Sequence, residues 1–238
     1  MSKFIILAIA RSGSTSLARL LNASRDVELA IEPFNPDYTQ WYPGEPNYIK
    51  RVKDEASLDK VADELFSRFT AIKTLNYQLD TKLYEHLALR TDMKVIMLYR
   101  KNVVKSVLSA EIAKQTNAWH KEDLNTAAKE VYSRLKPVNV DLITEYTNFI
   151  SSQHTQLLNF LKNNKPNKYI ELVYEELYSE DSEKNVQTIT EICEFLNIAK
   201  PEMEFIDKYM KVSNAKVNNS EQYKMIPNFE EISRKFSV

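Results

Sequence analysis

An apolar run near the N-terminus passes directly into a turn rich in serine and threonine. The run covers residues 4–10, a helix-like pattern starts at Leu17, and between them stand Arg11, Ser12, Gly13, Ser14, Thr15 and Ser16. Such a strand–turn–helix unit directs backbone N–H groups and the positive end of a helix dipole at one point, where an anion can bind. Gly13 is one of two glycines among 238 residues, which indicates that this turn requires glycine. An ordinary strand-to-helix connection with a serine N-cap is the alternative.

Strands and helical segments alternate along the chain. Runs typical of buried parallel strands cover residues 4–10, 69–75, 94–99 and 168–174. A shorter segment at 28–31 is a further candidate strand. Segments with helical periodicity cover 14–23, 55–68, 79–90, 102–116, 122–134, 138–164 and 182–196. This alternation predicts an α/β fold, a three-layer sandwich with a mostly parallel central sheet between helices. The length favours a single domain over residues 1–238.

Two segments fall outside this alternation. Residues 32–50 begin with a stretch that holds four of the eight prolines, together with Phe34, Trp41 and Tyr42. Proline excludes regular helix and central strand there, so we expect a long surface loop, either a binding loop or a plain crossover. Residues 197–238 are polar, and we expect them to be irregular.

Composition excludes several classes of protein. The longest apolar run has seven residues, well short of the roughly 20 that span a bilayer, and it is too short for a secretory signal. A net charge of −1 provides no general attraction for nucleic acid or an anionic membrane. The single cysteine, Cys193, excludes a disulfide within the chain. We therefore expect a cytoplasmic protein with no nucleic-acid partner and no transmembrane segment.

A second cationic motif follows the strand at 94–99. This strand ends in Arg100 and Lys101, and Ser109 lies in the helical segment beyond. In open α/β sheets, ligands bind at the carboxyl ends of the strands. Arginine offers a planar fork for phosphate oxygens, and lysine adds a compact charge. On its own this is an ordinary charged strand exit, but together with the first turn it indicates a second anion-binding corner.

The two motifs together do not fit a nucleotide kinase. A P-loop kinase or ATPase requires G-x-x-x-x-G-K-[ST] and a later strand that ends in an aspartate for Mg²⁺. The turn at 11–16 lacks that ending, and the strand at 94–99 ends in cations. A site of cations and amides without a metal suits transfer of a sulfuryl group, which carries a single negative charge. A P-loop-like kinase and a non-catalytic nucleotide-binding module are the alternatives.

Residues 9–17 resemble the 5′-phosphosulfate-binding loop of sulfotransferases that use 3′-phosphoadenosine-5′-phosphosulfate (PAPS). Residues 99–109 resemble the 3′-phosphate motif of that family, and 113–120 resemble a bacterial branch that includes trehalose sulfotransferases. Residues 174–177, Tyr-Glu-Glu-Leu, resemble a further family element. The resemblance implies a P-loop NTPase-like topology and metal-free sulfuryl transfer from PAPS to an acceptor hydroxyl on a small molecule or carbohydrate. The implied product is adenosine 3′,5′-bisphosphate.

The resemblance also implies which residues hold the donor. Its 5′-phosphosulfate falls to the turn, that is to Arg11, Ser12, Gly13, Ser14, Thr15 and Ser16. Its 3′-phosphate falls to Ser109 with either Arg100 or Lys101. The family spacing of eight residues before the serine leads to Lys101, where the family commonly has arginine, and Arg100 stands one place earlier. The choice between these two cations stays open.

The acceptor hydroxyl needs a general base. Glu32 is the first candidate, because the resemblance places a carboxylate there in the trehalose-type enzymes and burial can raise a carboxyl pKa to a useful value. His120, which follows Trp119, is the second. Lys73 interrupts an apolar strand, so we expect it to reach the ligands or to pair with a carboxylate such as Glu175. The acceptor and the oligomeric state stay open.

Overall fold

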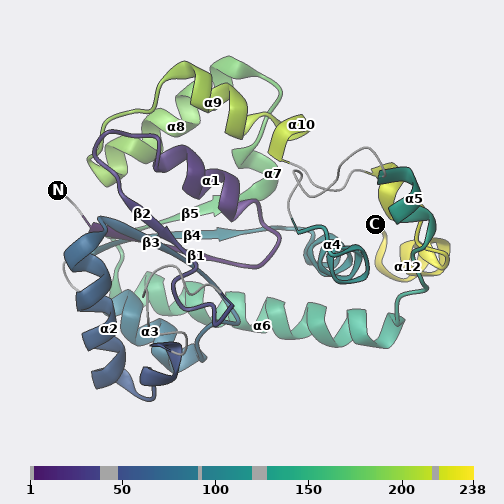
Figure 1. Ribbon diagram of the computed structural model, residues 1–238, viewed down its shortest axis with the longest axis horizontal. Coiled ribbons are helices and arrows are strands. Elements are labelled where there is room, and N and C mark those ends of the chain that lie inside the picture. Colours follow the sequence, from purple (N-terminus) through teal and green to yellow (C-terminus); the bar gives the residue numbers. More distant parts are fainter. Residues whose placement is uncertain (1–2, 38–47, 91–92, 120–127, 216–219) are drawn as a thin grey trace.

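The computed structural model describes residues 3–37, 48–90, 93–119, 128–215 and 220–238. In this part of the chain, five strands form one sheet in the order β2-β3-β1-β4-β5, and all neighbouring strands are parallel. The strands are β1 (Lys3–Ala8), β2 (Leu29–Ile31), β3 (Ala71–Leu75), β4 (Met93–Tyr99) and β5 (Tyr169–Val173). Figure 1 shows this sheet between two layers of helices. The predicted α/β class and parallel sheet are confirmed.

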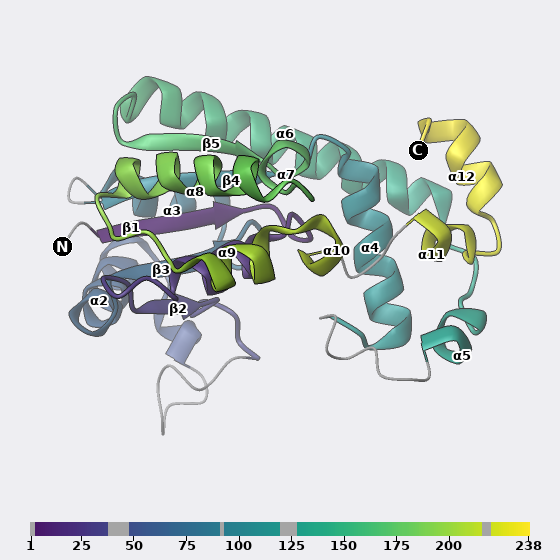
Figure 2. The same cartoon turned by 90° about the horizontal axis from the view of Figure 1, so that it is seen from above.

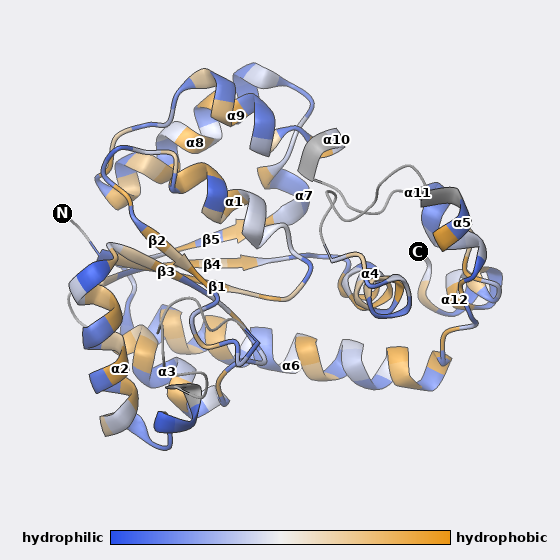
Figure 3. Cartoon of the chain, in the orientation of Figure 1, coloured by the Kyte–Doolittle hydropathy of each residue, from blue (hydrophilic) through white to orange (hydrophobic). Residues whose placement is uncertain are grey.

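Each face of the sheet carries its own helices and its own core. One face is covered by α1 (Ser14–Leu21), α8 (Ser182–Leu196) and α9 (Met203–Met210). The other is covered by α2 (Glu55–Arg68), α3 (Thr81–Leu89) and α6 (Val140–Asn164). Successive side chains of a strand point to opposite faces, so Ile5 packs into one core and Phe4 into the other. This is why β1 is apolar from Phe4 to Ala8, a stretch that is orange in the hydropathy colours of Figure 3.

A third, smaller core lies beyond the sheet. This core contains side chains of α4 (Val103–Thr116) and the N-terminal end of α6, together with side chains of α5 (Ala128–Ser133), α11 (Ser220–Lys224) and α12 (Phe229–Phe236). Figure 2 shows these short helices gathered at the end of the molecule farthest from β1. The α4 helix thus stands between this group and the carboxyl edge of the sheet, where the cationic motifs are.

The expectation that residues 197–238 are irregular is wrong. This segment forms α9, α10 (Val212–Ala215), α11 and α12. These helices are short and polar, and each of α9 and α12 buries only a narrow stripe, with Ile206 and Ile232 almost fully covered. In the described part of the predicted loop at 32–50, a 3₁₀ turn covers Tyr48–Arg51, and residues 38–47 lie outside the described part of the chain.

One predicted strand ends earlier than expected, and one predicted helix is described only in part. The predicted strand at 4–10 ends at Ala8, because the amide of Ala10 leaves the sheet and donates to the side chain of Asn76 instead. The predicted helix at 122–134 appears as α5 alone, since residues 120–127 are not described. In the described residues, no helix combines the length and the apolar character that crossing a membrane requires.

Candidate active site

A cleft of about 1280 Å³ opens at the carboxyl end of the sheet. The turn after β1, the start of α1 and the loop after β2 form one part of its wall, and α4 and α6 form another. Most of the predicted site residues line it: Arg11, Gly13, Ser14, Thr15, Ser16, Glu32, Lys73, Arg100 and Ser109. Residues from four separate parts of the sequence are therefore brought together here.

The turn depends on Gly13 for two reasons. Its φ is +79°, in the left-handed region that other residues rarely adopt. A Cβ on Gly13 would lie 2.7 Å from a ring carbon of Tyr178 and 3.0 Å from one of Tyr174. The Tyr178 hydroxyl also donates to the Gly13 carbonyl at 2.7 Å. Only glycine fits this position, as the sequence indicated.

The α1 helix begins at Ser14 without a side-chain cap. The first N–H groups of a helix have no acceptor within the helix, and the helix dipole is positive there. Ser14, Thr15 and Ser16, the first residues of α1, all line the cleft. Ser12 does not: it is fully buried, and its hydroxyl donates to the Ile9 carbonyl at 2.6 Å. The Ser12 side chain therefore lies outside the predicted anion site, and its hydrogen bond to Ile9 closes the turn.

Arg11 connects the two motifs. Its Nε donates to Ser109 Oγ at 3.1 Å, and its Nη1 donates to the Trp119 carbonyl at 2.7 Å. Burial lowers the pKa of Arg11, and the nearby charge of Arg100 acts in the same direction. Two arginines whose charges act on each other in one cleft favour an anion that binds between them.

The two cations at the end of β4 diverge. Arg100 turns into the cleft, where its guanidinium carbon lies 4.7 Å from the centre of the Tyr174 ring and its Nε lies 3.6 Å from Glu175 Oε1. Lys101 is 59% exposed, does not line the cleft, and forms an ion pair with Glu176 that raises its pKa. Consecutive residues at a strand end point in opposite directions. Of the two cations left open by the sequence, the structure brings Arg100 into the site.

Two buried polar atoms in this wall have no hydrogen-bond partner among the described residues. They are Arg100 Nε and Ser106 Oγ, and Ser106 lies one turn before Ser109 on α4. Most buried polar groups in proteins are hydrogen-bonded, so such pairs of orphan atoms need an explanation. Sequence reasoning missed Ser106, although its spacing of three residues from Ser109 puts both on one helix face.

Glu32 and Lys73 form a buried ion pair in the opposite wall. Lys73 Nζ lies 2.5 Å from Glu32 Oε1, and the two side chains are 1% and 8% exposed. Lys73 also donates to Thr15 Oγ1 at 3.4 Å, so it reaches the anion-binding turn as well. Burial lowers the pKa of Lys73, and the Glu32 charge opposes this shift. Lys73 does not pair with Glu175, the carboxylate named from the sequence. Glu175 instead accepts hydrogen bonds from the backbone N–H groups of Lys101 and Asn102.

Two amides hold the second oxygen of Glu32. Gln78 donates to Oε2 at 2.7 Å and Asn35 donates to it at 3.2 Å. Gln78 is itself oriented, since its Oε1 accepts from Thr74 Oγ1 at 2.9 Å and from the Leu75 amide at 3.1 Å. The sequence carried no signal for Gln78, which follows β3 in an unremarkable turn.

Of the remaining candidates, the aromatic residues and His120, the structure describes only some. Trp119 lines the cleft and is 41% exposed, and Phe34 borders the same cleft but is fully buried. His120, with Trp41 and Tyr42, lies outside the described residues. In the described part of the chain, no cluster of three or more His, Cys, Asp or Glu side chains is suited to hold a metal ion.

Comparison with known proteins identifies the family. The sulfotransferase domain family matches residues 1–237. Among solved structures, a sulfotransferase from Alicyclobacillus acidocaldarius is 15% identical with a TM-score of 0.51, covering 100% of this chain and 96% of its own. A sulfotransferase domain from the curacin biosynthetic pathway is 16% identical, with a TM-score of 0.46 and coverage of 100% and 98%. No curated protein sequence matches significantly. The fold is thus the P-loop-like fold of these enzymes, and the chain belongs to the sulfotransferase domain family and is a sulfotransferase.

Proposed function

We propose that the protein transfers the sulfuryl group of PAPS to an acceptor hydroxyl, leaving adenosine 3′,5′-bisphosphate. Members of the family generally use PAPS, which supports this donor. The observation that carries the proposal is that two buried atoms without a hydrogen bond, Arg100 Nε and Ser106 Oγ, belong to residues that line the same cleft as the glycine turn. A donor with a phosphate at each end would meet both features.

The two ends of PAPS would be held by different elements. The turn at Gly13 and the first residues of α1 would hold the 5′-phosphosulfate, together with Arg11. Arg100 and the α4 hydroxyls of Ser106 and Ser109 would hold the 3′-phosphate. When bound, PAPS supplies the sulfuryl group that the enzyme transfers.

Arg11 and Lys73 would stabilise the charge that develops on the leaving phosphate. Arg11 is half-buried beside the turn, and the buried Lys73 donates to Thr15 Oγ1. Preorganised donors of this kind are each worth about 3–4 kcal/mol of barrier. Because these groups are cations and amides, we propose that the transfer needs no metal.

Glu32 is the proposed general base. It lies at the cleft, and both of its oxygens are held, one by Lys73 and the other by Gln78 and Asn35. A carboxylate held from both sides keeps a fixed direction toward the acceptor. His120 stays the alternative base. The cytoplasmic location and the single-domain organisation also stay predictions.

Calorimetric titration with adenosine 3′,5′-bisphosphate tests the donor site. The Arg100→Ala variant should bind about 30-fold more weakly, because a charge-assisted hydrogen bond is worth about 2 kcal/mol. The matched control is Lys101→Ala, which removes the neighbouring cation outside the cleft and should change the affinity less than twofold. Equal losses in the two variants would refute the assignment of Arg100. If the wild-type protein binds the nucleotide but transfers the sulfuryl group of PAPS to none of the acceptors tested, only the binding half of the proposal stands.

A further inference from the structure

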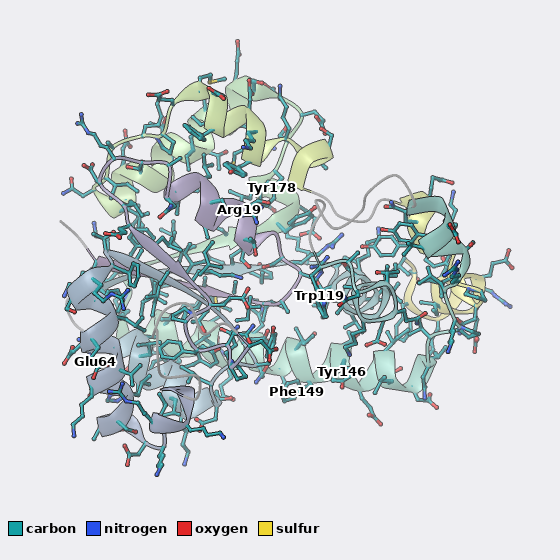
Figure 4. The ribbon with its side chains drawn as sticks, viewed as in Figure 1. Arg19, Glu64, Trp119, Tyr146, Phe149 and Tyr178 are labelled. Atoms are coloured by element: carbon teal, nitrogen blue, oxygen red, sulfur yellow. The ribbon has the colours of Figure 1, made fainter. Side chains whose placement is uncertain are left out.

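The cleft has two chemically different sides. On the side of α1 and α9 its wall carries cations, among them Arg19 and Lys208. On the side of α6 it carries large apolar side chains that are open to solvent. These are Tyr77 after β3, Trp119 after α4, and Tyr146 and Phe149 on α6, exposed by 60%, 41%, 41% and 54%. Figure 4 labels the last three around α4 and α6.

Such a cluster is unusual on a protein surface. Covering one large apolar side chain is worth about 1.5–3 kcal/mol, so leaving several uncovered at one place is unfavourable unless a ligand covers them. Contiguous exposed apolar patches with a polar rim mark binding sites. This patch lines the same cleft as Glu32 and Lys73.

The polar side chains on this side are largely engaged within the protein. Asn76 accepts from the Ala10 amide at 3.1 Å and donates to Gln153 at 2.9 Å. Asn35 donates to Glu32 and accepts from the Asp37 amide at 3.1 Å. Gln78 is engaged in the same way, as described above. A sugar ring needs several side chains that can read its hydroxyls, and each of these amides already uses one donor and at least one acceptor position within the protein.

The charges on this side are also balanced. Lys114 forms an ion pair with Glu111 at 2.6 Å and lies 5.4 Å from the centre of the Tyr146 ring. Glu32 is matched by Lys73. Asp37, the other acid of this wall, is exposed to solvent. Apart from the solvent-exposed Asp37, the carboxylates of this wall are therefore each paired with a lysine, and the exposed aromatic side chains form its apolar surface.

We infer that the acceptor is a hydrophobic alcohol, a hydroxyl carried on an apolar body that packs against Tyr146 and Phe149. This acceptor class rests on the proposed sulfuryl transfer from PAPS. The apolar body lies against α6, and its hydroxyl reaches Glu32, which takes the proton as the oxygen bonds to sulfur. The O–S bond to the donor phosphate breaks, and the phosphate leaves with the electron pair. A polyhydroxylated sugar is the disfavoured acceptor.

The test measures binding to protein saturated with adenosine 3′,5′-bisphosphate. The probes are 2-naphthol and 1-octanol as apolar alcohols and trehalose as a polyol, each titrated by calorimetry. At least one apolar alcohol should bind at least tenfold more tightly than trehalose. The Phe149→Ala variant should weaken that binding about tenfold, in line with losing half of a buried phenyl contact. The matched control is Leu89→Ala, an exposed apolar residue of α3 away from the cleft.

The outcomes separate the acceptor class from the proposed function. The affinity for adenosine 3′,5′-bisphosphate should be the same in wild type, Phe149→Ala and Leu89→Ala, which also shows that the variants fold. If the nucleotide does not bind to wild type, the proposed function fails. If it binds but trehalose binds as tightly as the alcohols, or neither alcohol binds, or Phe149→Ala changes nothing, only the acceptor class is overturned.

Discussion

Replacement of Gly13 by alanine tests the central turn of the site. The new Cβ would have to lie 2.7 Å from a ring carbon of Tyr178 and 3.0 Å from its hydroxyl oxygen. Tyr178 is buried, so its ring has no open space into which to move. Forcing one methyl group into a packed site costs about 1–3 kcal/mol. An alanine at φ +79° adds about 1–2 kcal/mol of backbone strain.

The two costs together destabilise the Gly13→Ala variant by about 2–5 kcal/mol, which shifts the midpoint of urea unfolding by about 1–2 M. The control is Tyr178→Phe, which removes only the hydrogen bond to the Gly13 carbonyl. Burial raises the pKa of Tyr178, so its hydroxyl is a donor at any ordinary pH, and its loss costs about 1 kcal/mol. That carbonyl still accepts from the Leu17 amide, so it is not left unpaired.

Circular dichroism followed through urea unfolding measures both variants, and calorimetry with adenosine 3′,5′-bisphosphate measures their sites. Gly13→Ala should lose both stability and nucleotide affinity, whereas Tyr178→Phe should lose little of either. If Gly13→Ala unfolds at the same urea concentration as Tyr178→Phe, the turn tolerates a side chain. The argument from φ and from the two tyrosines would then be wrong.

Three further perturbations follow from the buried groups. Lys73→Met leaves Glu32 buried without its cation and should cost about 3–5 kcal/mol in urea unfolding, while the double variant with Glu32→Gln should recover part of that loss; equal stability of both would contradict the pairing. Gln78→Leu removes the hydrogen bond to Glu32 Oε2 and should lower kcat with little change in KM for PAPS. The kcat of Gln78→Asn should lie between those of Gln78→Leu and wild type. An unchanged kcat would refute the positioning role of Gln78. Burial lowers the pKa of His154 below its usual 6.5. The stability should therefore fall as the pH drops below about 6.5, because the unfolded chain then takes up a proton that the folded protein does not. The slope of the unfolding free energy between about pH 5 and 7 should flatten in His154→Phe, and an unchanged slope would exclude this histidine.

The parts of the fold that the sequence predicts correctly are those that local chemistry dictates. The apolar run of β1 is needed because both faces of the strand are covered, and Gly13 is needed because its φ is positive. The helices of 197–238 were missed because their buried stripes are too narrow to stand out in a polar segment. Ile206 and Met210 in α9 are four residues apart, and α12 buries only Ile232 almost completely.

Side-chain direction is the part of the site that the sequence leaves open. The family spacing leads to Lys101, but the direction in which β4 ends brings Arg100 into the cleft. Likewise, the partner of Lys73 depends on the pairing of β2 with β3, which places Ile31 opposite Lys73 and so brings Glu32 beside it. Neither relation can be read from a single chain without knowing how its strands align.

The short motif at the end of β5 contacts both of the proposed anion-binding corners. This motif forms α7 (Tyr174–Leu177) and ends at Tyr178. The Tyr174 ring packs against Gly13 and lies under Arg100, and Glu175 accepts the amides of the backbone that follows β4.

One segment thus contacts the turn at Gly13 through two tyrosines and the exit of β4 through a tyrosine and a carboxylate. In the sequence, Tyr-Glu-Glu-Leu resembles a family element but supplies none of the predicted donor-binding or base residues. Its role is to position Arg100 and the Gly13 turn relative to each other across a separation of more than 70 residues from either motif. A site that binds one donor by both ends needs such a fixed spacing, since a shift of either corner would leave one phosphate without its partners.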